Sequence, residues 1–139
     1  MVKRMTRLQR EMFLEKPYLA VVGIEEPGLS PRVVPLWYDY KPSTGFSIIV
    51  KKKSKKLLLL RAAKRFSLCI QEPQPPYKHV SAQGPIIEIR DCVDHVDLLA
   101  VATKYLGIQE AQKFLQNRLP SDSLILIMDP KKWVTADYS

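Results

Sequence analysis

The residues best suited to chemistry form one basic run, Lys51-Lys-Lys-Ser-Lys-Lys56, with five lysines in six positions. The run lies between an apolar segment at 46–50 and a helix-forming segment that begins at Ser54. Ser54 is a good N-cap residue, but lysines are unfavourable at a helix N-terminus, which carries about half a positive charge. A bound anion would resolve this conflict, since free backbone N–H groups, a hydroxyl and ammonium groups could all bind it. The run therefore predicts a phosphate site.

Two other interpretations of the lysine run stay open. A run of lysines is commonly a solvated face, and short basic runs also contact nucleic acid. The formal net charge of +8 over 139 residues is typical of a protein with an anionic partner. A position between a strand and a helix favours phosphate over nucleic acid, because nucleic-acid contacts more often lie in terminal arms or along exposed helices.

The elements that must position this run are mostly strands. Apolar residues within 5–15 predict an amphipathic helix that Pro17 ends. The segments 18–24, 32–40 and 46–50 predict strands joined by turns, which is the pattern of an antiparallel meander. Further on we expect a helix from Ser54, strands at 66–70, 77–89, 123–128 and 133–136, and helices at 93–105 and 108–119. The strand at 77–89 is expected to bend at Gly84-Pro85. This order predicts one α+β domain over residues 1–139, a mainly antiparallel β-barrel with short peripheral helices.

Composition and single residue types exclude several classes of function. No apolar run approaches the roughly 18 residues that span a bilayer, and the basic start lacks the apolar core of a signal peptide. We therefore expect a cytoplasmic protein without a membrane partner. Cys69 and Cys92 stand alone and predict no metal site. The sequence holds no Ser-His-Asp, Cys-His or paired-carboxylate pattern, so no catalytic side chain is assigned, and the reactive atom would belong to a bound cofactor.

Several segments, in order and spacing, resemble the pyridoxamine-5′-phosphate-oxidase-like split β-barrels, a family that includes flavin- and deazaflavin-dependent oxidoreductases. The matching segments are Pro-Arg-Val-Val-Pro-Leu-Trp-Tyr at 31–38, Lys-x-Lys-Ser-x-Lys at 51–56, and the segments 66–70, 75–80 and 130–133. The resemblance covers nearly the whole chain. The resemblance implies an FMN-binding type of split barrel, hydride transfer between a bound cofactor and a small planar organic substrate, and a homodimer with the cofactor groove at the subunit interface.

The resemblance also implies site residues, position by position. The cofactor phosphate would be held by Lys51, Lys53, Ser54 and Lys56. The strand that runs along the cofactor ring would consist of Val33, Val34, Pro35, Leu36 and Trp37. The groove would further be lined by Tyr77, Lys78 and Trp133.

The cofactor implied by the resemblance is coenzyme F420 or FMN. More lysines are present than one phosphate needs, which slightly favours F420 because its tail adds glutamate carboxylates. Haem, which some split barrels bind, is disfavoured because neither His79 nor His95 lies where axial ligation can be argued. The alternative from another class is a non-catalytic module that binds a flavin nucleotide or nucleic acid.

Overall fold

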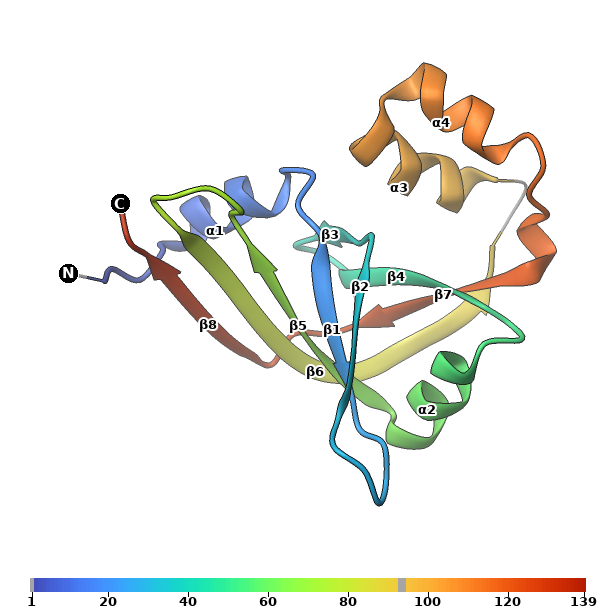
Figure 1. Cartoon of the computed structure of the whole chain (residues 1–139), viewed down its shortest axis with the longest axis horizontal. Helices are drawn as coiled ribbons and strands as arrows, with labels where there is room; N and C mark the ends of the chain where they lie inside the picture. The colour runs from blue at the N-terminus through green and yellow to red at the C-terminus, as the bar shows by residue number, and fades with distance from the viewer. Residues whose placement is uncertain (1, 93–94) are drawn as a thin grey trace.

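A computed structural model of the chain describes residues 2–92 and 95–139 (Figure 1). The strands are β1 (Ala20–Ile24), β2 (Arg32–Leu36), β3 (Asp39–Lys41), β4 (Gly45–Lys51), β5 (Arg65–Gln71), β6 (Lys78–Asp91), β7 (Ser123–Met128) and β8 (Lys132–Asp137). The helices are α1 (Arg7–Leu14), α2 (Lys55–Ala63), α3 (Val96–Leu106), α4 (Ile108–Leu115) and the short 3-10 helix η1 (Pro120–Asp122). Antiparallel strands with peripheral helices agree with the predicted α+β class.

The strands form one curved antiparallel sheet in the order β2-β1-β5-β6-β7-β4-β3, with β8 also paired to β6. The long strand β6 joins the two halves of the sheet. Its first half pairs with β5 and β8, and its second half, from Ile86 onward, pairs with β7. The predicted long strand with a bend at Gly84-Pro85 is therefore confirmed, and the bend is where β6 changes partners.

Gly84 is required at this bend because another backbone segment passes close to it. A Cβ built on Gly84 would lie 1.8 Å from the carbonyl oxygen of Asp129. The adjoining backbone is held there by hydrogen bonds, with the Lys131 N–H donating to Gln83 at 2.9 Å and the Asp129 N–H donating to Pro85 at 3.0 Å. Only glycine leaves room for this approach.

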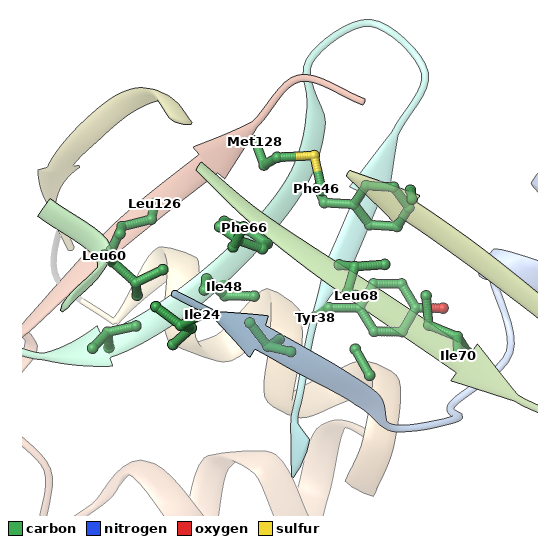
Figure 2. Close-up of a cluster of buried hydrophobic side chains, with 14 of the residues drawn as sticks. Ile24, Tyr38, Phe46, Ile48, Leu60, Phe66, Leu68, Ile70, Leu126 and Met128 are labelled. Atoms are coloured by element: carbon green, nitrogen blue, oxygen red, sulfur yellow. The ribbon is translucent and has the colours of Figure 1, made fainter. Parts of the chain in front are cut away.

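Buried apolar side chains from strands β1, β4, β5, β6 and β7 and from helices α1 and α2 fill the interior of the barrel. Figure 2 shows several of them converging, among them Ile24, Tyr38, Phe46, Ile48, Leu60, Phe66, Leu68, Ile70, Leu126 and Met128. Leu57 and Leu60 come from α2, so this helix closes one end of the barrel. Burial of each large aliphatic side chain stabilises the fold by about 1.5–3 kcal/mol, and this burial fixes α2 on the sheet.

The expected strand at 32–40 is divided in the structure. β2 ends at Leu36, Trp37 and Tyr38 turn the chain, and β3 begins at Asp39. β2 and β3 then lie at opposite ends of the strand order. The predicted meander is therefore wrong: β1 pairs with β2 and β3 pairs with β4, but β2 does not continue into β3. The reason is that Tyr38 leaves the ladder to become fully buried, and its hydroxyl donates to the Leu14 carbonyl at 3.0 Å.

The two later helices differ from their predicted bounds. The expected helix at 93–105 is α3, Val96–Leu106; residues 93 and 94 lie outside the described part of the chain. The expected helix at 108–119 is α4, which ends at Leu115, and Pro120 disfavours helical backbone at the residue before it. In the described residues, no helix has both the length and the apolar character to cross a membrane.

Candidate functional site

The lysine turn, residues 51–56, joins the end of β4 to the start of α2. Ser54 is the N-cap, as predicted, and its Oγ accepts a hydrogen bond from the Leu57 N–H at 3.3 Å. The same hydroxyl donates to the Lys51 carbonyl at 2.8 Å. Ser54 therefore fixes the shape of the turn. The backbone N–H groups of Lys55 and Lys56 have no acceptor among the described residues, as is usual for the first turn of a helix.

The five lysines of the turn divide into two electrostatic classes. Lys52 pairs with Asp91 at 2.8 Å and Lys55 pairs with Glu26 at 3.3 Å. Within residues 2–92 and 95–139, Lys51, Lys53 and Lys56 make no ion pair. These three are the lysines that the resemblance assigns to a cofactor phosphate. The turn thus presents three uncompensated ammonium groups beside a helix N-terminus.

Glu26 connects the lysine turn to strand β2, and sequence reasoning did not identify it. Its carboxylate accepts two hydrogen bonds from the Arg32 guanidinium, each at 3.4 Å, besides the ion pair with Lys55. The hydrogen bond from Arg32 is the main cause that holds the pKa of the Glu26 carboxyl below its ordinary value. A buried carboxylate between two cations therefore fixes the first residue of β2 relative to the first residue of α2.

Strand β2 lies at an edge of the sheet and pairs only with β1 among the described strands. Val33 and Pro35 are exposed, whereas Val34 and Leu36 are half-buried and pack against the core. The outer edge of the strand therefore leaves backbone groups available for a ligand. Pro35, as expected of an edge strand, contributes no N–H.

Trp37 lies in a different environment from the β2 residues that precede it. Its indole stacks on the Tyr105 ring of α3, with centroids 5.1 Å apart and an interplanar angle of 7°, and contacts the Phe114 ring of α4 at 5.2 Å. The Tyr105 hydroxyl donates to the Tyr18 carbonyl at 2.9 Å. Trp37 thus holds the α3–α4 hairpin against the barrel.

Three further predicted groove residues lie away from the lysine turn in one copy of the chain. Lys78 is the first residue of β6, and Asp91, which pairs with Lys52 of the lysine turn, is its last. Lys78 and the lysine turn therefore lie at opposite ends of this long strand (Figure 1). Tyr77 directly precedes Lys78 and accepts a backbone hydrogen bond from Tyr138. Trp133, on β8, packs on Tyr40 and Phe46 and lies under the Arg10 guanidinium at 3.7 Å.

A cavity of about 420 Å³ borders the lysine turn. Lys51 forms one wall, and α3, α4 and the segment after α4 supply others, including Phe114 and Arg118. The Arg118 guanidinium lies over the Phe114 ring at 3.9 Å. Sequence reasoning missed these two residues. Their spacing of four along a predicted helix was the one signal that could have paired them.

The outer face of the sheet carries a second, more apolar hollow of about 260 Å³ across β1, β2, β5, β6 and β8. Its exposed apolar side chains are Val33, Val134 and Val21, with 68%, 51% and 45% of their surface accessible. Apolar side chains gathered on one sheet face are typical of a surface that another molecule covers.

No protein-family model and no curated protein matches the sequence. Solved structures do share its fold. An F420 reductase superposes with a TM-score of 0.74 at 18% identity, over 89% of this chain and 94% of that chain. A FAD-binding protein from Mesorhizobium loti superposes with a TM-score of 0.65 at 16% identity, over 100% of this chain and 99% of that chain. The haem storage protein HutZ from Vibrio cholerae superposes with a TM-score of 0.65 at 12% identity, over 94% of each chain. The predicted split β-barrel fold is thereby confirmed.

Proposed function

We propose that this split β-barrel binds a flavin or deazaflavin nucleotide and transfers hydride between that cofactor and a small planar organic substrate. The observation that carries the proposal is the charge division of the lysine turn. Lys52 and Lys55 are neutralised by acidic partners, while Lys51, Lys53 and Lys56 make no ion pair in the described structure and belong to the turn that leads into the N-terminus of α2. A phosphate dianion satisfies that arrangement.

The cofactor phosphate is held by this turn. The ammonium groups of Lys53 and Lys56 supply charge, and the free backbone N–H groups of Lys55 and Lys56 supply directed donors. Ser54 keeps these groups in place by capping α2 and bonding to Lys51. The Glu26 carboxylate neutralises Lys55, and thereby limits repulsion in the turn when the site is empty.

The cofactor ring lies along the open edge of β2. Val33 and Pro35 present exposed apolar surface there, and the outer backbone groups of the strand can bind the polar edge of a ring. The ion pairs of Glu26 with Arg32 and Lys55 set the distance between this edge and the phosphate site. Trp37 supports the end of the strand through its stack on Tyr105.

A homodimer would complete the groove. Tyr77 and Lys78 lie at the end of β6 opposite to Asp91, the partner of Lys52, and Trp133 lies on β8, so in this proposal they come to the cofactor from a second copy of the chain. The exposed valines on the outer sheet face supply apolar surface for such an interface.

When bound, the cofactor supplies the hydride chemistry. The residues of the chain bind the phosphate, orient the ring and exclude water from its face. We prefer F420 over FMN, because three uncompensated lysines exceed the need of one phosphate and because an F420 reductase shares the fold. A flavin is the second choice of cofactor, because a FAD-binding protein also shares the fold.

Titration of the purified full chain with F420, FMN and a mixed-sequence DNA duplex tests the proposal. We expect saturable binding of F420, detected by a change in its fluorescence, with weaker binding of FMN. Failure of both cofactors to bind, together with DNA binding that falls steeply with salt, would establish the nucleic-acid module instead.

A further inference from the structure

The cavity beside the lysine turn, which we name the α4 cavity, has the composition of a site for a small ligand. It has a volume of about 420 Å³, within the range of small-molecule sites. Two cations, one carboxylate, an amide, an aromatic ring and a leucine lie around it: Lys51, Arg118, Asp122, Asn117, Phe114 and Leu98. Charge and flat apolar surface are therefore present together.

Arg118 is an exposed residue whose guanidinium contacts an aromatic ring. Its guanidinium lies over the Phe114 ring at 3.9 Å, and that ring contacts Trp37 at 5.2 Å. Arg118 makes no ion pair in the part of the chain that the structure describes. This contact leaves the N–H groups of the guanidinium available, and a guanidinium can bind a carboxylate through two parallel hydrogen bonds.

The walls of the cavity are tied to the lysine turn. The Lys52 N–H donates to the Asp122 carbonyl at 2.8 Å, which joins η1 to the turn. The α3–α4 hairpin is anchored separately, because the Lys104 ammonium donates to the Leu14 carbonyl at 2.9 Å. Lys51 and Arg118 therefore lie on the rim of one cavity, and Asp122 is its acidic member.

We propose that the α4 cavity binds a small planar organic acid, and that this acid is the substrate class of the function proposed above, on which this part of the inference rests. The ligand carboxylate binds Arg118. Its flat body lies against Phe114 and Leu98, and an O–H or N–H group at its other end donates to Asp122. Aromatic or conjugated carboxylates that carry a hydroxyl or amino group have this chemistry.

The test uses the full chain and the probe 4-hydroxybenzoate, with 4-hydroxybenzamide as its uncharged counterpart. Binding is measured by calorimetry, with and without saturating F420 or FMN. We expect binding of the acid and at least about tenfold weaker binding of the amide, since a hydrogen bond between charged groups is strong. Arg118→Gln should weaken binding of the acid by about tenfold or more. The affinity of Arg118→Lys for the acid should lie between those of Arg118→Gln and wild type.

Lys113→Gln is the matched control, because Lys113 lies on α4 five residues before Arg118, is exposed and pairs with Glu110 at 3.3 Å. It should bind the acid like the wild type. If Arg118→Gln binds the acid as tightly as Lys113→Gln does, or if acid and amide bind equally, the α4 cavity is not a carboxylate site. A protein that binds cofactor but not the acid overturns this inference alone. A protein that binds the acid through Arg118 but binds no cofactor keeps the site and overturns the proposed function.

Discussion

The Glu26 carboxylate lies 3.3 Å from the Lys55 ammonium group, so a turn after β1 holds the first residue of the helix that follows the lysine turn. The same carboxylate accepts hydrogen bonds from Arg32 at the start of β2. One acidic residue therefore links the strand proposed to hold the cofactor ring to the helix proposed to hold its phosphate.

Replacement of Glu26 by Gln should lower the free energy of unfolding at neutral pH, because Lys55 and Arg32 lose their shared anion. The folded-state pKa of Glu26 is lower than its ordinary value of 4.5. Its contribution is thus fully present above pH 4.5 and is lost as the pH falls through the folded pKa. Urea titrations between pH 7 and pH 3 should show wild type and variant converging in acid. If the free energies of unfolding of wild type and variant differed by the same amount at every pH, the ionised Glu26 carboxylate would not be the cause of the difference.

Lys104 should make stability rise with pH in mildly alkaline solution. Burial lowers its pKa from 10.5 to about 8, against the opposing charges of Asp39 and Glu15. Between these two values the unfolded chain keeps a proton that the folded chain has lost, so the free energy of unfolding increases with pH.

The Lys104→Met variant should lack this rise, and urea titrations from pH 8 to pH 10 measure it. The rise in stability ends near pH 10 because of Tyr38 and Tyr105. Burial raises the pKa values of both from 10.0, so above that pH the tyrosines ionise in the unfolded chain first and stability falls. An equal rise in wild type and Lys104→Met would show that Lys104 is not the group responsible.

The stack of Trp37 on Tyr105 should hold the α3–α4 hairpin in place. Trp37→Ala should lower the free energy of unfolding by about 3 kcal/mol, near the lower limit for large-to-small changes in a packed site. Trp37→Phe keeps an aromatic ring, so it should lower the free energy of unfolding by less than Trp37→Ala does. Limited proteolysis should cut the hairpin of Trp37→Ala first. Unchanged protease resistance of the hairpin would show that other contacts anchor it.

Leu60 and Leu58 form a matched pair on helix α2. Leu60 is fully buried in the barrel, whereas Leu58 is 68% exposed. Leu60→Ala should lower the free energy of unfolding by about 2–5 kcal/mol, and Leu58→Ala should change it by less than about 0.5 kcal/mol. Chemical denaturation of both variants measures the difference, and similar values for the two would contradict the burial of α2 described above.

Sequence reasoning succeeded where the structure depends on local interactions. Ser54 as a helix cap, the bend of β6 at Gly84 and the end of the first helix before Pro17 all follow from residue type and near neighbours. The lysine turn was found for the same reason, because an unfavourable charge at a helix N-terminus is visible in the sequence.

The remaining features depend on contacts between distant segments. Nothing near Trp37 in the sequence indicates that it stacks on Tyr105, so the chain from 32 to 40 was expected to form one strand. Glu26 lies in a turn, where an acidic residue usually faces solvent, and its two cationic partners become visible only when the turn packs beside α2. The place of Arg118 in the α4 cavity likewise depends on how the hairpin docks.

The central claim is tested most directly by cofactor affinity in two double variants of the lysine turn. Lys53→Ala with Lys56→Ala removes lysines without ion-pair partners among the described residues, whereas Lys52→Ala with Lys55→Ala removes the two that pair with Asp91 and Glu26. We predict that the first pair weakens binding of F420 or FMN by about a hundredfold or more, and that the second weakens it by less than about tenfold. Equal affinity of the two double variants would contradict the phosphate site.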